Sequence, residues 1–124
     1  MKVEVSNGEL IDKMVILRIK SERIENAESV ARVRAELEHL EGAVSELPVE
    51  PPERLVAELK TVNESLWEIE DDIRRKEACR EFDSEFIELA RSVYITNDRR
   101  AALKRELNVA TESCFFEEKS YEEF

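Results

Sequence analysis

A heptad repeat of apolar residues between Leu55 and Glu77 is the feature that most constrains how this chain can fold. The apolar positions alternate between spacings of four and three residues: Leu55, Leu59, Val62, Leu66, Ile69 and Ile73. Such a spacing places all of them along one side of an α-helix. A stripe of this length is normally buried against other helices, so the stretch predicts a long amphipathic helix in an all-α protein.

Residues that break helices are scarce and lie together. The chain has two glycines and three prolines among 124 residues, and 40% of its residues are charged. The prolines fall between Pro48 and Pro52, where they separate the chain into two pairs of helices. We therefore predict an all-α fold, a four-helix bundle made of two helical hairpins with long third and fourth helices.

Capping residues set the expected helix boundaries. Ser6 to Glu9 has the pattern of a capping box, so a first helix should follow to about Ile24. Asn26 is a plausible start for the second helix, Pro52 fits the first turn of the third, and Asp83 or Ser84 should cap the fourth. The fourth helix either breaks at Thr96–Asp98 or runs through it. The expected apolar seam of the first helix consists of Leu10, Met14, Leu17 and Ile24.

The length of the chain predicts a single helical domain over residues 1–124, with residues 113–124 as a partly ordered tail. The tail carries four aromatic residues among acids, and we expect Phe115 and Phe116 to dock on the bundle. At 1.5 Å per residue, the third and fourth helices should each span roughly 40 Å and the first about 25 Å. The longer hairpin should then overhang the shorter one. Because exposed apolar seams are usually covered by another subunit, we expect a homodimer.

The net charge of −11, from 30 acidic and 19 basic residues, restricts the partners. Nucleic acids and anionic membrane surfaces attract cationic proteins, so we expect neither as a partner and favour a protein with a basic surface. Two cysteines and the single His39 offer no disulfide framework and no zinc ligand set, and we expect no metal and no cofactor. The N-terminus lacks the apolar run of a signal peptide, which predicts a cytoplasmic protein.

Polar residues follow a second line beside the apolar seam of three helices. If the three lines converge, they form a cationic pocket suited to a small carboxylate, phosphate or nucleotide sugar. The candidate ligand-binding residues are Lys13, Lys20, Asn63, Trp67, Glu70, Arg74, Tyr94, Asn97, Lys104 and Asn108. Asparagines favour this hypothesis, because they are poor helix formers placed here in mid-helix.

The competing interpretation is that these lines are solvated positions flanking the core, which is usual on helices this rich in charge. Glu70 and Arg74 distinguish the two. As a surface pair four residues apart, they predict a loss of about 0.5 kcal/mol or less for Arg74→Ala. In a buried pocket the same change should cost more than about 1.5 kcal/mol, and we expect the larger value. A magnesium site is a weaker alternative, because Glu68 and Asp72 lie on a different side of the helix from Glu70 and Glu77.

Four strings, SNGELIDKMVILRIKSERI, VNESLWEIEDDIRRKE, FIELARSVYITNDRRAALKREL and EEKSY, resemble a family of small, uncharacterised bacterial proteins. The resemblance covers nearly the whole chain, and it implies a context near sugar-transferase and surface-polysaccharide genes. It implies no activity and no catalytic residue.

Two functions are compatible with these observations. The first is a small acidic helical interaction or accessory protein of a bacterial carbohydrate pathway. The alternative is a bundle that binds or processes a small anion between the first, third and fourth helices. The sequence predicts neither the presence nor the absence of an enzymatic activity.

Overall fold

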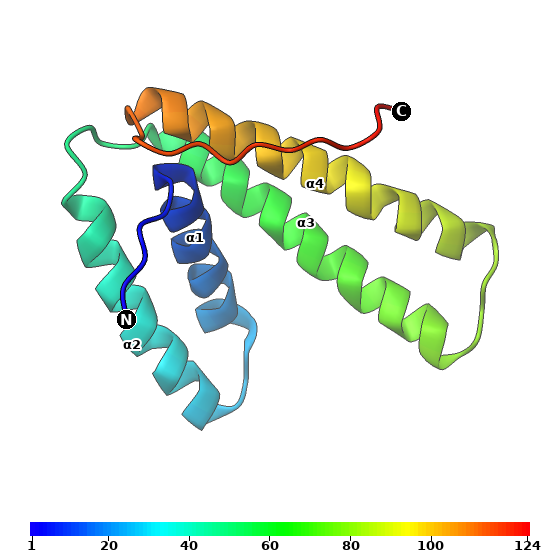
Figure 1. Cartoon of the computed structure of the whole chain (residues 1–124). Helices are drawn as coiled ribbons and strands as arrows, with labels where there is room; N and C mark the ends of the chain where they lie inside the picture. The colour runs from blue at the N-terminus through cyan, green and yellow to red at the C-terminus, as the bar shows by residue number, and fades with distance from the viewer.

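The computed structural model describes residues 1–124 and contains four α-helices and no strand (Figure 1). The helices are α1 (Asn7–Arg23), α2 (Ala27–Ser45), α3 (Glu53–Ala78) and α4 (Ser84–Ala110). The predicted all-α fold with long third and fourth helices is confirmed. Helix α4 runs without interruption through Thr96–Asp98, and Gly42 lies inside α2. None of the four helices combines the length and apolarity needed to span a membrane.

Side-chain caps begin three of the helices. Ser6, Asn26 and Asp83 each accept a hydrogen bond from the backbone N–H three residues ahead, at 3.2, 2.9 and 3.0 Å. These bonds satisfy amides that have no partner within the helix. The second half of the predicted capping box is absent, because the Glu9 carboxylate contacts Lys104 on α4 instead.

Helices α3 and α4 both end on a residue in the left-handed conformation. Arg80 has φ 53° and Glu112 has φ 56°. At the end of α4 the Ser113 N–H donates to the Asn108 carbonyl at 2.8 Å, which closes the last turn. Glycine normally fills such a position because a Cβ is strained there. This chain has only two glycines, and neither is at a helix end of this kind.

The helices form two antiparallel hairpins, α1–α2 and α3–α4 (Figure 1). Helix α1 is central, because it packs against α2, α3 and α4, whereas α2 packs only against α1. The shorter hairpin is attached to one end of the longer one, where α3 begins and α4 ends (Figure 1). The hydrophobic core lies at this junction: Ile11, Met14, Val15, Ile19, Leu55, Leu59, Leu103 and Leu107.

The other half of the long hairpin contributes nothing to this core. No residue from Glu64 to Ala102 is buried, and we call this segment the distal hairpin. The predicted overhang is therefore present. The apolar seam of α3 continues into it, but its residues there are only half-buried: Leu66, Ile69 and Ile73.

Candidate functional site

The structure brings together only part of the predicted polar site. Asn63, Lys104 and Asn108 are buried where α1, α3 and α4 meet. The side chains that meet them on α1 are Glu9 and Asp12, neither of which belongs to the predicted set. The three polar lines therefore converge over one short region, and with different residues from α1.

Asp12 is the centre of this cluster. Its side chain is almost completely buried, with 1% of the residue exposed. The carboxylate accepts from the Asn63 amide at 2.9 Å and from Arg100 Nε at 3.1 Å, and Arg100 makes a second contact through its terminal nitrogen. The hydrogen bond to Asp12 raises the pKa of the Arg100 guanidinium above its ordinary value. The cluster ties α1 to both long helices.

Lys104 forms a second, adjacent ion-pair group. Its ammonium group donates to Glu9 on α1 at 2.6 Å and to Glu117 in the tail at 2.8 Å. Desolvation of the buried ammonium group opposes its charge, but the two carboxylates outweigh it and raise the pKa of Lys104. The same hydrogen bond from Lys104 lowers the pKa of Glu117. Lys104 thus joins the bundle to its C-terminal tail.

Gly8 allows α1 to approach α4 this closely. Its N–H donates to the side-chain oxygen of Asn108 at 2.6 Å. A Cβ at this position would lie 2.4 Å from the Lys104 carbonyl oxygen, well inside contact distance. The backbone amide of Gly8, at the start of α1, has no acceptor within its own helix, and the Asn108 side chain supplies one.

The polar cluster is internally neutralised. Both of its cations, Arg100 and Lys104, are paired with carboxylates of the same chain. No buried side-chain nitrogen or oxygen lacks a hydrogen-bond partner. Every group of the cluster that could bind an anion already has a partner within the chain. The cluster therefore serves to fix the helices relative to one another.

The Glu70–Arg74 pair lies in solvent, contrary to the pocket hypothesis. The two side chains are 57% and 75% exposed and meet at 2.9 Å as an ordinary pair one turn apart. Their line continues past the end of α1, so no helix covers it. From this exposure we now expect Arg74→Ala to change the free energy of unfolding only slightly, in place of the large loss predicted from the sequence.

The remaining candidates on α1 and α3 are also separate from the cluster. Lys13 is exposed and pairs with Glu36 of α2 at 3.2 Å. Lys20 is half-buried on α1. Trp67 is half-buried, with the Arg23 guanidinium 5.9 Å from its ring centre. Its indole covers the edge of the core, close to where α1 ends.

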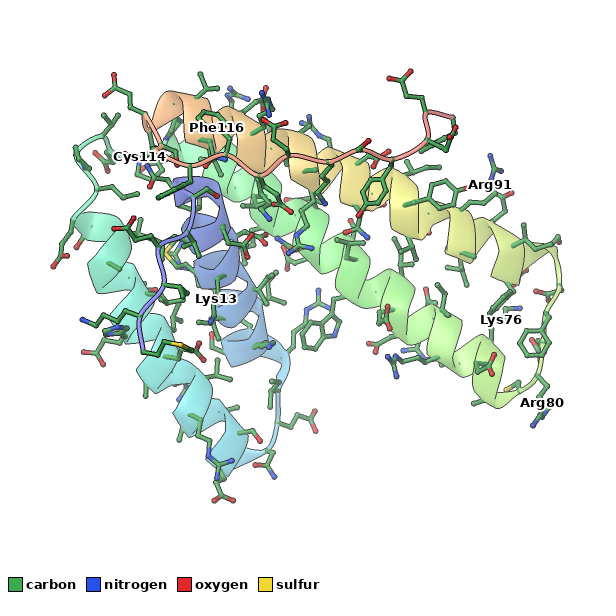
Figure 2. All side chains as sticks on the ribbon, in the orientation of Figure 1. Lys13, Lys76, Arg80, Arg91, Cys114 and Phe116 are labelled. Carbon is green, nitrogen blue, oxygen red and sulfur yellow. The ribbon has the colours of Figure 1, made fainter.

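Tyr94 and Asn97 lie beneath the tail, which runs along α4 (Figure 1). Phe116, labelled in Figure 2, lies 5.5 Å from the Arg105 guanidinium, and Phe124 stacks edge-on against Tyr94 at 5.0 Å. Two hollows of about 600 and 240 Å³ remain between tail and helix. Of the two residues expected to dock on the bundle, Phe116 contacts Arg105 but stays 40% exposed, and Phe115 is 51% exposed. The helical pattern did not indicate that the tail would run along α4.

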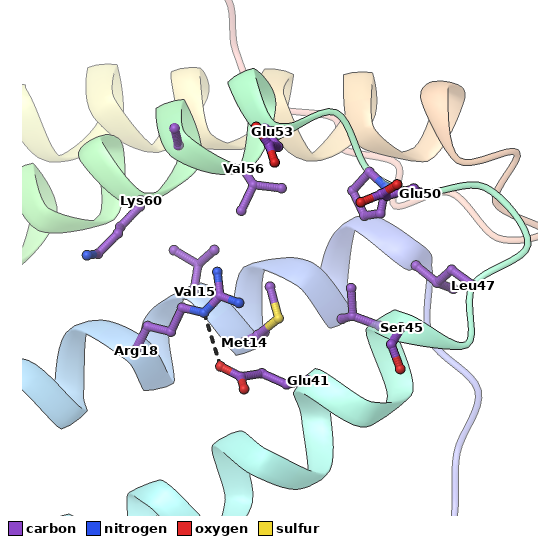
Figure 3. Close-up of a pocket in the computed structure, with 13 residues that line it drawn as sticks. Met14, Val15, Arg18, Glu41, Ser45, Leu47, Glu50, Glu53, Val56 and Lys60 are labelled. Atoms are coloured by element: carbon purple, nitrogen blue, oxygen red, sulfur yellow. Dashed lines mark hydrogen bonds and ion pairs between the residues drawn. The ribbon is translucent and has the colours of Figure 1, made fainter.

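A cleft of about 720 Å³ separates α2 from α3 (Figure 3). No Cα atom of α2 lies within 8 Å of a Cα atom of α3, and Met14 and Val15 of α1 line the cleft between them. Aliphatic and charged side chains share its walls, and Arg18 of α1 pairs with Glu41 of α2 at 3.3 Å. Glu50 and Glu53 line the cleft without a cationic partner, so the cleft suits apolar side chains better than a free anion.

The turn between α3 and α4 holds a lysine among carboxylates. Lys76 lies near this turn, far from α1 (Figure 2), and contacts Glu81, Asp83 and Glu85 at 3.2, 3.0 and 3.0 Å. Hydrogen bonds to these groups, that to Glu85 foremost, raise the pKa of Lys76. No group of three Asp, Glu, His or Cys side chains is arranged to hold a metal ion.

Together, these features define a small all-α protein whose polar groups join helices and whose open surfaces are a half-buried helical hairpin and the cleft between α2 and α3. The chain belongs to DUF6165, a family of unknown function, whose family model matches residues 1–124. The comparison with curated proteins gives no match, and the comparison with solved structures gives none.

Proposed function

We propose that this protein is a helical interaction module that docks through its distal hairpin. The single observation that carries the proposal is that no residue from Glu64 to Ala102 is buried, although this segment holds more than half of each long helix. A two-helix hairpin with an apolar seam is marginal by itself, because its seam stays in contact with water. A partner that covers the seam would stabilise it.

The first partner that we propose is a second copy of the chain. Near the core, α1 packs on both α3 and α4, and beyond the end of α1 the same seam continues without a third helix. Two distal hairpins packed about a twofold axis would make a four-helix bundle, a common closed arrangement. The half-buried seam residues that would meet are Leu66, Ile69, Ile73, Phe86, Leu89 and Val93.

The further partner in this proposal is a protein with a basic surface, because the chain carries a net charge of −11. The resemblance to bacterial proteins encoded near sugar-transferase genes makes such a transferase, acting in the cytoplasm, the first candidate. The role proposed here is that of an accessory subunit without chemistry of its own.

Sedimentation velocity tests the homodimer. We expect the wild type to sediment as a dimer at micromolar concentration, and Ile69→Asp to sediment as a monomer because it places a charge in the seam. Ser65→Asp introduces the same charge at an exposed position of α3 and should leave the dimer intact. A monomeric wild type, or equal effects of the two variants, would reject docking through the distal hairpin.

The small-anion alternative has weaker support, because Arg100 and Lys104 are already paired. A thermal-shift screen of phosphates, carboxylates and nucleotide sugars, with and without magnesium, tests it directly. Stabilisation that depends on ligand concentration would favour it over the interaction module.

A further inference from the structure

Helix α4 contains a basic strip in an otherwise acidic chain. The sequence from Arg99 to Arg105 has four cations and no acidic residue. Two of the cations are used within the bundle, since Arg99 donates to Glu58 at 2.8 Å and Arg100 pairs with Asp12. Lys104 pairs both with Glu9 of α1 and with the C-terminal tail, and Arg105 pairs with the tail.

The tail supplies carboxylates to these two cations. Glu117 meets Lys104 at 2.8 Å, and Glu118 meets Arg105 at 3.5 Å. The smaller hollow lies between them, where the short side chains of Ala101 and Ala102 leave space. Two adjacent acidic residues of an extended segment can therefore pair with Lys104 and Arg105 near the C-terminal end of α4.

Aromatic contacts extend the recognition along the helix. Phe116 lies against the Arg105 guanidinium, and Phe124 lies against Tyr94 beside the larger hollow. A free anion would use only the cations, whereas these contacts require a chain that carries both acidic and aromatic side chains.

The tail is held weakly enough to be replaced. No residue after Ser113 makes a backbone–backbone hydrogen bond, and every residue from Cys114 to Phe124 is exposed. The Lys104–Glu117 pair is partly buried, but the remaining attachments are exposed ion pairs and ring contacts, each of which contributes little in water. The two hollows show that the tail fills the surface beneath it incompletely.

We propose that the face of α4 from Tyr94 to Arg105 is a docking surface for a short acidic segment with aromatic residues from a partner protein. The chain's own tail occupies this surface as an intramolecular competitor. The charge complementarity of Lys104 and Arg105 with Glu117 and Glu118 identifies the segment's chemistry. This surface adjoins the seam of the distal hairpin at Val93, but its charge recognition lies at Lys104 and Arg105, so the proposal does not depend on a homodimer.

Amide NMR on the full chain tests the proposal with a peptide of residues 113–124 carrying Cys114→Ser. A variant with a loosened tail combines Glu117→Gln, Glu118→Gln and Phe124→Ala, all at exposed positions. We expect the peptide to shift amide signals between Tyr94 and Asn108. Half-saturation should need at least fivefold less peptide for the loosened-tail variant than for the wild type, because an attached tail competes at high effective concentration.

Two controls define the chemistry. Adding Arg105→Glu to the loosened-tail variant should weaken peptide binding at least tenfold, and a peptide with every Glu→Gln should cause no shifts. The proposal is overturned by absent shifts, by shifts centred on the α2–α3 cleft, or by equal half-saturation for wild type and variant. Citrate at matched ionic strength that reproduces the shifts would assign a small-anion site and also reject docking of a segment. If the triple variant loses its folded spectrum, Glu118→Gln with Phe124→Ala provides the same comparison.

Discussion

At the scale of single residues, Asp12 holds three helices in register through Asn63 and Arg100. Replacing it by alanine leaves Arg100 half-buried without a carboxylate and the Asn63 amide without its acceptor. Because Arg100 keeps 29% of its side chain exposed, water offsets part of the loss. We expect Asp12→Ala to lower the free energy of unfolding by about 3 kcal/mol in urea titrations. A loss below about 1 kcal/mol would show that water replaces the carboxylate.

Arg74→Ala removes an ion pair of similar length from the surface of the same protein. Its partner Glu70 is 57% exposed, so the change leaves no buried charge behind. We expect a loss of about 0.5 kcal/mol or less, measured in the same titrations. A loss above about 1.5 kcal/mol would restore the pocket that the sequence pattern suggested.

The two glycines offer a second matched pair. A Cβ on Gly8 would meet the Lys104 carbonyl oxygen at 2.4 Å, whereas a Cβ on Gly42 would meet nothing within 4 Å. Gly8→Ala should therefore separate α1 from α4 and cost about 2–3 kcal/mol. Gly42→Ala, inside an exposed stretch of α2, should stabilise the protein by up to about 1 kcal/mol. Thermal unfolding of both variants shows whether the change in stability has opposite signs at the two positions. Destabilisation by both substitutions would contradict the prediction.

The buried polar residues were predictable only in part. Asn63, Lys104 and Asn108 stand out because they adjoin an apolar seam in mid-helix. Asp12 was missed because the seam expected for the first helix runs through Leu10 and Met14 and treats α1 as buried on one side. Helix α1 is instead covered by three helices, and Asp12 shares the buried stripe of Gly8, Val15 and Ile19. The sequence did contain a signal for Asp12, because it is the one acidic residue in a stripe whose members lie four, three and four residues apart.

At the scale of elements, the tail should respond to acid. The folded-state pKa of Glu117 lies below its ordinary value of 4.5, because Lys104 donates to the carboxylate. The stabilisation is therefore complete above the unfolded-state pKa and is lost as the pH falls through the folded-state value. Tail amide signals should shift toward those of a free peptide below about pH 4.5. Glu117→Gln should show free-tail signals already at neutral pH, while a tail unchanged at pH 3 would contradict the role of this pair.

Helix boundaries followed from local chemistry, which is why they were predictable. Ser6, Asn26 and Asp83 cap the helices that they were expected to cap, and the segment from Pro48 to Pro52 separates the hairpins. The position of α2 was not predictable in this way. Its seam resembles that of the other helices, but in the structure it packs on α1 alone, and the choice among similar apolar faces depends on the whole fold.

At the scale of the whole molecule, the uneven distribution of buried residues predicts uneven stability. Amides from Glu64 to Ala102 should exchange with deuterium faster than those of α1, because no buried residue anchors the distal hairpin. If two copies dock there, exchange in this segment should slow as protein concentration rises from nanomolar to micromolar, while exchange in α1 stays constant. Hydrogen exchange with mass spectrometry measures both segments at once, and an exchange rate independent of concentration would argue against docking.

The central position of α1 also determines when the molecule can fold. Its closest partners include Asn108, 100 residues further along the chain, which contacts Gly8. At about 5–20 residues per second, synthesis of that intervening stretch takes on the order of 5–20 s. During that time the apolar faces of α1 have α2, and later α3, beside them, but not α4. The core therefore cannot be completed until α4 has been made, although α1 belongs to the first hairpin of the four helices.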